Sequence, residues 1–387
     1  MRVAARWFRH TFKGDALYAL KANPSPWVIR TLAECGVAGF DVASIPEIEL
    51  AREHAPASRL AFMHPVKSRR AIASAYHDYG VRVFALDSHE ELAKIQDATG
   101  GADDLSLMVR LAVETSGAAY ALNGKFGVEA AAAPELLLAA RRATNDLMGV
   151  TFHVGSQCMR PSAYQAAMAQ ASRALVRAGV FADVVDVGGG FPSVYPGMIP
   201  PDLSEYVAAI DRGLSEMMVH ETTELWCEPG RALVAEGSSL LTRVELRKGD
   251  GLYLNDGAFG SLFDAAHLKW RFPVRRIRPD GAPDEAPLRP FQLYGPTCDS
   301  ADHMPGPFWL PEDMAEGDYV EVGMLGAYGV AMATRFNGFG ELETVCVNDA
   351  PMASMFGLAP RSIRTPAGEA GTVVKLSRAR GRKRRRR

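Results

Sequence analysis

The fold is constrained most by an alternation, from the start of the chain to about residue 235, of short apolar runs and longer segments with apolar residues at helical spacing. The runs are apolar almost throughout, as strands are when a parallel sheet is covered on both faces. We expect eight strands, at Leu17–Leu20, Gly39–Val42, Arg59–Phe62, Val81–Ala85, Ser106–Leu111, Gly149–His153, Val184–Val187 and Glu224–Cys227. Eight strand–helix units favour a closed (β/α)₈ barrel of the TIM type over an open doubly wound sheet.

The pattern changes after Arg231, where no long helical segment is present and short strand-like runs are separated by Gly, Pro and Asp. The expected strands are Ser239–Leu246, Leu252–Asn255, Gln292–Tyr294, Asp318–Val322 and Glu343–Val347. They predict an antiparallel β domain, a small barrel or sandwich, with a Pro-rich polar loop at 278–290. The predicted organisation is a barrel domain at 1–235, a β domain at 236–370 and a basic, disordered tail at 371–387.

Composition limits the classes of function. The 387 residues carry a formal net charge of −2, which gives the chain as a whole no electrostatic reason to bind nucleic acid. Weak contacts with a polyanion such as RNA are conceivable only at the basic end of the tail, RARGRKRRRR at 378–387. No apolar run is long enough to cross a membrane. The five cysteines are scattered without metal-ligand spacing, which indicates reduced thiols in a cytoplasmic protein and no metal site.

Polar residues stand at the carboxyl ends of six predicted barrel strands, namely Lys21, Asp41, Arg110, His153, Asp186 and Glu228. Barrels of this kind place their chemistry at that end of the strands. A single lysine there is most often a solvated boundary residue, and a single histidine a hydrogen-bonded core residue. Six polar groups on one rim are harder to explain by packing, because unpaired buried charges are costly. The sequence therefore predicts a site at the mouth of the barrel.

Two further motifs follow the last two predicted barrel strands. Gly188–Gly190 is either a tight turn or a run of backbone N–H groups that approaches a phosphate. Glu228–Arg231, with the sequence EPGR, combines a carboxylate and a guanidinium within four residues. A guanidinium suits a phosphate, and a carboxylate suits a protonated ring nitrogen.

The β domain carries four polar candidates in three segments. Cys298 and Asp299 are adjacent in GPTCDSAD, Tyr328 lies between glycines in GAYG, and Asp264 lies in the otherwise apolar stretch that ends in FDAAH. Taken singly, each has an ordinary interpretation. A cysteine is most often a small buried apolar residue, a tyrosine between glycines a packed turn, and an aspartate before a short helix its cap.

Taken together, these segments resemble the fold type III pyridoxal-phosphate decarboxylases, the family that acts on ornithine, lysine, arginine and diaminopimelate. The matching stretches, all in one order along the chain, are YALKAN at 18–23, FDVAS at 40–44, NGKFGV at 123–128, HVGS at 153–156, VGGGFP at 187–192, EPGR at 228–231, NDGAFGS at 255–261, GPTCDSAD at 295–302 and GAYG at 326–329. Within the family, GPTCDSAD, FDAAH at 263–267 and FNGF at 336–339 resemble the ornithine/lysine branch. The diaminopimelate branch is expected to carry glutamate where Asp299 stands.

The resemblance implies a cofactor, pyridoxal 5′-phosphate, and roles for five of the six rim residues, Asp186 excepted. Lys21 would hold the cofactor as a Schiff base, which suits a lysine whose ammonium is disfavoured in a dry pocket. Glu228 would keep the pyridine nitrogen protonated, and His153 would stack on the ring. The phosphate would be held by Ser156, Gly188, Gly189, Gly190, Arg231 and Tyr328. Asp41 and Arg110 would lie close behind, near the ring and the Schiff base.

The resemblance also implies how a substrate binds. Asp264 and Asp299, with Tyr328, would receive the distal ammonium of a basic amino acid, because two carboxylates repel each other unless a cation joins them. Cys298 would return a proton to the carbon that loses CO₂. The site would be shared across a homodimer, with Cys298, Asp299 and also Asp264 coming from the partner chain.

Several alternatives remain open at this stage. The chain is expected to convert L-ornithine to putrescine, for polyamine biosynthesis. The first alternative is a lysine or dual lysine/ornithine decarboxylase. Lysine is one methylene longer than ornithine, and one methylene changes the free energy of substrate binding by only about 1–3 kcal/mol. Diaminopimelate decarboxylase, a racemase and a non-catalytic regulatory homologue are further alternatives. Residues 5–14 are expected to end the first barrel helix, and the first strand of such proteins is expected to be missing, through a misassigned start or a truncation.

Overall fold

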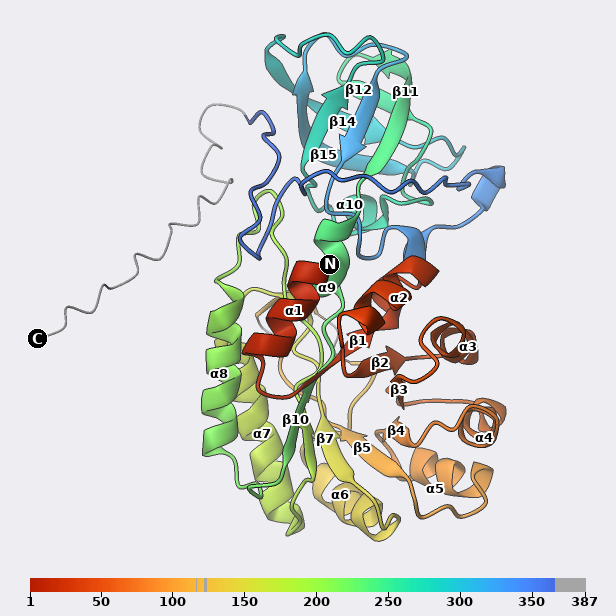
Figure 1. Ribbon diagram of the computed structural model, residues 1–387, viewed down its shortest axis with the longest axis vertical. Coiled ribbons are helices and arrows are strands. Elements are labelled where there is room, and N and C mark those ends of the chain that lie inside the picture. The colour runs from red at the N-terminus through yellow and green to blue at the C-terminus, as the bar shows by residue number, and fades with distance from the viewer. Residues whose placement is uncertain (116, 122–123, 366–387) are drawn as a thin grey trace, which may run out of the picture.

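In the computed structural model, which describes residues 1–115, 117–121 and 124–365, eight parallel strands form a closed barrel in the order β1-β10-β9-β7-β5-β4-β3-β2 (Figure 1). The TIM-type barrel is therefore confirmed. The strands are β1 (Asp15–Ala19), β2 (Gly39–Val42), β3 (Arg59–Phe62), β4 (Val83–Leu86), β5 (Ser106–Arg110), β7 (Met148–Thr151), β9 (Val184–Asp186) and β10 (Glu224–Cys227). Three of them have the predicted bounds, and the other five differ by one or two residues at either end.

Helices surround the barrel (Figure 1). They are α1 (Arg2–Thr11), α2 (Pro26–Glu34), α3 (Ile45–His54), α4 (Arg69–His77), α5 (His89–Ala98), α6 (Ala133–Arg142), α7 (Ser162–Ala178) and α8 (Leu203–Glu216). Three of the helices begin at a serine that caps them, since the side chains of Ser44, Ser68 and Ser88 accept hydrogen bonds from the backbone N–H three residues on. Such caps end the strand-to-helix loop within a few residues and fix where each strand end points.

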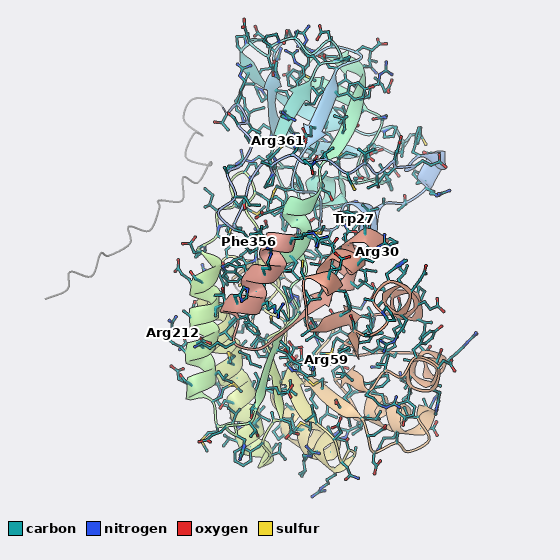
Figure 2. The ribbon with its side chains drawn as sticks, in the orientation of Figure 1. Trp27, Arg30, Arg59, Arg212, Phe356 and Arg361 are labelled. Carbon is teal, nitrogen blue, oxygen red and sulfur yellow. The ribbon has the colours of Figure 1, made fainter. Side chains whose placement is uncertain are left out.

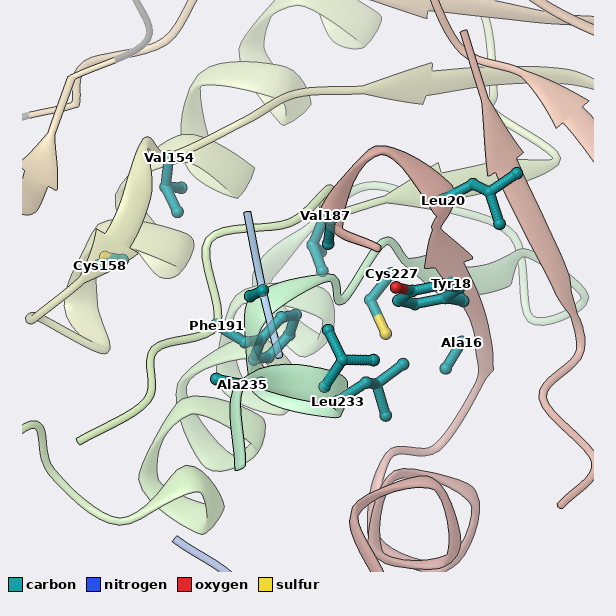
Figure 3. Close-up of a cluster of buried hydrophobic side chains, with 14 of the residues drawn as sticks. Ala16, Tyr18, Leu20, Val154, Cys158, Val187, Phe191, Cys227, Leu233 and Ala235 are labelled. Atoms are coloured by element: carbon teal, nitrogen blue, oxygen red, sulfur yellow. The ribbon is translucent and has the colours of Figure 1, made fainter. Parts of the chain in front are cut away.

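The barrel core has two layers of apolar side chains. Inside the barrel lie Leu17, Ala61, Met63, Val83, Ala85, Met108, Val184 and Trp226. The strands approach closely there, because a Cβ on Gly149 would lie only 2.6 Å from Sδ of Met108. Outside it, Tyr18, Cys227, Phe191 and Leu233 belong to the larger cluster between strands and helices (Figure 3). Parallel strands need this cover on both faces, which explains their nearly continuous apolar runs.

The β domain is a six-stranded sheet in the order β13-β16-β11-β12-β14-β15. Its strands are β11 (Leu240–Lys248), β12 (Gly251–Leu254), β13 (Val274–Ile277), β14 (Leu288–Tyr294), β15 (His303–Pro311) and β16 (Tyr319–Val322). The edge strands β13 and β15 lie close together, so the sheet curls towards a barrel. Pairing is antiparallel, as predicted, except between β12 and β14, which run parallel, so the sheet is mixed and not antiparallel throughout.

Two further predictions for this domain are wrong. Glu343–Val347 is not a strand, and Val345 and Val347 in it are 70% and 65% exposed. The alternating pattern there has no neighbouring strand with which to pair in the described part of the chain, and pattern alone cannot supply one. The Pro-rich loop ends earlier than expected, because β14 begins at Leu288. A short sheet in the barrel domain, β6 (Ala118–Tyr120) with β8 (Ser156–Cys158), was not predicted either.

The β domain lies beyond one end of the barrel, with the short helices α9 (Arg231–Val234) and α10 (Phe263–His267) at the junction (Figure 1). Direct hydrogen bonds join the domains next to Lys21, since Asn23 Nδ2 donates to Gly326 O (2.9 Å) and the Tyr328 N–H donates to Ala22 O (2.7 Å). These bonds connect YALKAN to GAYG, two segments about 300 residues apart in the sequence.

The last described segment, 350–365, crosses between the two domains (Figure 2). Phe356 packs edge-on against Trp7 of α1, with ring centroids 6.0 Å apart, and Arg361 pairs with Glu321 of β16 at 3.2 Å. The predicted tail at 371–387, and with it the basic end of the chain, lies outside the described residues. Among the described helices none is long and apolar enough to span a membrane.

Candidate active site

Lys21 follows β1, in the single helical turn η1 (Leu20–Ala22). Its Nζ is 2.9 Å from Oδ2 of Asp41, at the end of the neighbouring strand β2, and 45% of the side chain is exposed. Partial loss of hydration lowers the pKa of Lys21, but the carboxylates of Asp41 and Glu228 outweigh this and raise it. The expectation that the ammonium is disfavoured here is therefore wrong. Asp41 holds Lys21 as a cation.

Glu228 and Asp186 lie at the ends of the adjacent strands β10 and β9, and both are buried. The pKa of Glu228 is raised well above its usual value, first by burial and then by the negative charges of Asp186 and Asp41. Its Oε1 is buried and has no hydrogen-bond partner among the described residues. A buried carboxyl oxygen without a partner is costly, so it marks a place where another group is expected to bind.

His153 follows β7 and faces the same region. Its Nδ1 accepts a hydrogen bond from the Gly155 N–H (2.9 Å), so the proton of the neutral ring belongs on Nε2. Burial, together with the charges of Arg110 and Lys21, lowers the pKa of His153 to about 3. The ring is therefore a neutral flat surface at any pH near neutrality.

Arg110 is half-buried at the end of β5, with its guanidinium carbon 5.6 Å from the ring centroid of Phe126. Arg110 and His153 border a cavity of about 550 Å³, whose wall also includes Glu114, Gly124 and Phe126. A cavity of this volume accommodates a small organic molecule.

The three glycines after β9 approach their neighbours too closely for any side chain. Gly188 has φ +67° and a Cβ there would lie 2.0 Å from the carbonyl oxygen of Phe152. Gly190 has φ +97° and its Cβ would lie 2.6 Å from the carbonyl oxygen of Gly155. These positions therefore require glycine, and they leave the backbone of 188–190 free of side chains next to His153 and Glu228.

Arg231 begins α9 and is buried. Its guanidinium donates to Tyr195 Oη at 3.0 Å and lies 3.5 Å from Ser156 Oγ, and its carbon is 4.8 Å from the ring centroid of Tyr328. Trp270 is stacked on it at 4.6 Å. The predicted phosphate residues Ser156, Arg231 and Tyr328 are thus brought together, with a planar donor suited to an oxyanion.

Asp264 belongs to this same cluster, because its Oδ2 lies 3.2 Å from Arg231 of the same chain. The expectation that it reaches the site from a partner chain is therefore wrong. Burial raises the pKa of Asp264, while the Arg231 charge acts in the opposite direction. The ion pair compensates two buried charges that would be costly alone.

Cys298 and Asp299 are exposed, and their contacts lie within the β domain. The Cys298 thiol is 3.2 Å from Oδ1 of Asn337, and Asp299 accepts a hydrogen bond from the Ala301 N–H (2.9 Å). The structure therefore does not bring these two residues to Lys21 within one chain.

Tyr195, Trp270 and Thr151 are parts of the site that the sequence did not identify. Tyr195 and Trp270 pack on Arg231, and the Thr151 hydroxyl donates to Asp186 (2.9 Å). No motif singles out Tyr195 or Trp270. Thr151 is the last residue of β7, at the carboxyl end of a barrel strand, and this position is the signal that could have identified it.

The residues present fit pyridoxal phosphate. Glu228 Oε1, which has no partner in the described part of the chain, suits a protonated ring nitrogen. The glycine backbone beside Arg231 and Ser156 suits a phosphate. The neutral imidazole of His153 suits a ring face, and Lys21 suits an aldehyde. In residues 1–115, 117–121 and 124–365 no group of three or more His, Cys, Asp or Glu side chains is placed to hold a metal ion.

Two family models match the chain, the pyridoxal binding domain of the pyridoxal-dependent decarboxylases at residues 1–235 and their C-terminal sheet domain at 156–326. A lysine/ornithine decarboxylase of Selenomonas ruminantium is 34% identical over 89% of this chain and 86% of its own length. Antizyme inhibitor 2 of Xenopus laevis is also 34% identical, over 88% of this chain and 77% of its own length. The crystal structure of a lysine/ornithine decarboxylase from Vibrio vulnificus, complexed with putrescine, matches with a TM-score of 0.76 and 32% identity over 90% of this chain and 92% of that one. Together with the site geometry, these findings show that the chain belongs to the pyridoxal-dependent decarboxylases.

Proposed function

We propose that this protein decarboxylates a small basic amino acid, L-ornithine to putrescine, in polyamine synthesis. The observation that carries the proposal is the convergence of Lys21, Glu228 and the Arg231 cluster at one end of the barrel, where Glu228 Oε1 lacks a partner among the residues that the structure describes. The relatives named lysine/ornithine decarboxylase support a substrate with a distal ammonium group. The five free cysteines and the lack of a membrane-spanning helix among the described residues agree with a cytoplasmic enzyme.

Five of the six rim residues, all but Asp186, have a task in this proposal. Pyridoxal phosphate, when bound, supplies a ring that stabilises the negative charge left on the α-carbon as CO₂ departs. Glu228 holds a proton at the ring nitrogen, Lys21 anchors the aldehyde carbon through Nζ, and His153 supports the ring face. Ser156, Gly188–Gly190, Arg231 and Tyr328 bind the phosphate. Asp41 keeps Lys21 oriented through the 2.9 Å contact, and Arg110 lines the cavity beside His153.

The distal ammonium of the substrate is assigned to Asp264 of this chain and Asp299 of a second copy. Cys298 of that copy then gives a proton to the α-carbon. Cys298 and Asp299 are exposed in a single chain, whereas a residue that donates a proton in a water-free site should be covered. A second copy of the chain that covers them would meet this requirement, which supports a shared site. Three apolar side chains in the β domain are also exposed, namely Phe336, Phe339 and Val345. A homodimer would cover part of the apolar surface that they form.

The decisive experiment offers ornithine, lysine, arginine and diaminopimelate in parallel to protein purified with pyridoxal phosphate, and measures the amines released. Putrescine as the dominant product supports the ornithine assignment, and cadaverine moves it to lysine, the second candidate. If no amine is released from any of the four substrates while the cofactor absorbance is present, the protein is not a decarboxylase of these amino acids. That result favours a regulatory homologue, an alternative that the similarity to antizyme inhibitor 2 also suggests.

Lys21→Ala tests the anchor in the same assay. Without the amine that joins the aldehyde, we expect the visible absorbance of bound cofactor to disappear on dialysis and the rate of decarboxylation to fall by at least 1000-fold. Lys125→Ala is the matched control, because this lysine lies near Phe126 rather than on the rim of β1. Visible absorbance that survives dialysis in Lys21→Ala would contradict the assignment.

A further inference from the structure

The buried carboxylate of Asp186 has no part in the function proposed above, yet its surroundings are specific. It lies at the end of β9 with no exposed surface. Oδ1 accepts a hydrogen bond from the Gly188 N–H (2.9 Å) and Oδ2 accepts one from the Thr151 hydroxyl (2.9 Å). The Glu228 carboxyl provides a third hydrogen bond to the same carboxylate. Three donors converge on one carboxylate, which favours its ionised form.

The arrangement of donors decides which of the two acids carries the proton. Asp186 is fully supplied with donors, whereas Oε1 of Glu228 has no partner among the described residues. Burial raises the pKa of both groups, and the hydrogen bond between them lowers the pKa of Asp186 and raises that of Glu228. The proton therefore resides on Glu228, which donates it to Asp186.

We propose that Asp186 is a positioning residue: it accepts a hydrogen bond from Glu228, so the two carboxyl groups hold one proton between them, and Glu228 presents this proton to the ring nitrogen of pyridoxal phosphate. With pyridoxal phosphate bound, Glu228 would hold a proton at the ring nitrogen. The negative charge of Asp186, which contacts Glu228, would oppose the loss of that proton. This inference rests on the proposed function only for the identity of the proton acceptor.

Other titratable groups surround the pair, and the charged ones raise or lower the pKa values of Asp186 and Glu228. Asp41 of β2 adds negative charge and raises both pKa values, and Lys21 of η1 lowers that of Glu228. The Cys227 thiol of β10 is itself kept neutral, because burial and the two carboxylates raise its pKa. His153 is neutral as well. Asp186 is thus the carboxylate that Glu228 touches, and the others act from a distance.

Asp186 also connects the two ends of the cofactor site. Its Oδ1 fixes the N–H of Gly188, the first residue of the glycine run, and the Gly188 carbonyl accepts a hydrogen bond from the Glu228 N–H (2.8 Å). The Asp186 side chain therefore helps to position both the Glu228 carboxyl, proposed to face the ring nitrogen, and the turn at Gly188, proposed to face the phosphate.

The first test needs no activity and uses the apoprotein. The infrared carbonyl band of a protonated carboxyl is followed against pH in the wild type, in Glu228→Gln and in Asp186→Asn, and the Glu228 signal is isolated by difference. We expect the Asp186→Asn change to lower the midpoint at which Glu228 ionises by at least about one pH unit, since a contacting negative charge is removed and an amide donor replaces it. An unchanged midpoint would overturn the proposal.

The second test uses the holoenzyme. In Asp186→Asn we expect pyridoxal phosphate to bind about tenfold more weakly by equilibrium dialysis. The alkaline limit of kcat should move to lower pH, with KM changed less than threefold. Asp183→Asn is the matched control, because the same change is made on the other end of the strand, where Asp183 pairs with Arg141 at 2.7 Å. A purely structural role would lower the melting temperature of Asp186→Asn without moving the pH limit, and that result would contradict the inference.

The two hypotheses fail in different ways. A wild type with no decarboxylase activity on any substrate contradicts the proposed function but leaves the infrared measurement interpretable. An active wild type whose Glu228 band does not respond to Asp186→Asn contradicts the shared proton alone. Thr151→Val adds a graded change, since it removes one donor to Asp186 without altering any charge. It should raise the proton affinity of Asp186 and shift the Glu228 midpoint less than Asp186→Asn does.

Discussion

At the scale of single residues, Cys298 is proposed to donate a proton inside the active site, yet in one chain it is exposed and lies beside Asn337. If it donates the proton to the product carbon across a dimer, Cys298→Ala should lower kcat by about 10²–10⁴-fold, the usual contribution of a positioned acid, with cofactor binding unchanged. Cys346→Ala is the control, because Cys346 is also an exposed thiol. Equal rates for the two variants would remove Cys298 from the reaction.

The strand-end rule found the polar rim from sequence because such barrels bring the carboxyl ends of their strands to one face. It placed Lys21, Asp41, His153 and Glu228 correctly on that rim. It could not give their protonation, which depends on distances between residues far apart in the chain. The raised pKa of Lys21, caused by Asp41, and the ion pair of Asp264 with Arg231 are both of this kind. Tyr195 and Trp270 were missed because aromatic residues carry no positional signal of their own.

At the scale of elements, the serine caps connect local sequence to site geometry. Ser44 accepts a hydrogen bond from the Glu47 N–H at the start of α3, two residues after β2 ends. Ser44→Ala should lower the free energy of unfolding by about 1 kcal/mol, measured by urea denaturation, because the first turn loses its acceptor. Ser44→Asn, which retains a capping oxygen, should lose much less. Equal losses in the two variants would show that the cap is not what the hydroxyl contributes.

Strands were predicted correctly where burial on both faces produces a continuous apolar run. They were predicted wrongly where a strand forms only because a neighbouring strand is present to pair with it. The barrel strands are covered on both faces, so their apolar runs are long enough to recognise, and β2, β3 and β10 have the predicted bounds. In the β domain, the strand-like run at 343–347 remains unpaired among the described residues, while β13 and β15 form without a clear signal. A strand needs a neighbour, and sequence periodicity does not identify one.

At the scale of the whole molecule, the segment 350–365 crosses between the domains and should stabilise them as one unit. Arg361 joins this segment to Glu321 of the β domain, and Ser354 donates to Glu236 in the linker between domains (2.7 Å). Arg361→Ala should lower the melting temperature by a few degrees, because the buried carboxylate of Glu321 loses one of its cations. Arg278→Ala is the control, since that arginine pairs with the exposed Asp280 and should change the melting temperature little.

The pH dependence of global stability follows from buried acids, of which Asp256 is the clearest. Burial is the main cause that raises its pKa, from the ordinary 3.8 to about 6, despite hydrogen bonds from Ser261. The folded state therefore binds this proton more tightly than the unfolded state does, and stability falls as pH rises from about 4 through 6. Relative to Asp256→Asn, which cannot titrate, the wild type should lose about 1.4 kcal/mol of unfolding free energy between pH 5 and pH 7.5. Urea denaturation of both proteins at the two pH values measures this difference, and a difference independent of pH would mean that Asp256 keeps its ordinary pKa. The two hydrogen bonds from Ser261 favour the ionised form of Asp256 and hold the turn between the two residues, so they offset part of the cost of burying the carboxylate at neutral pH.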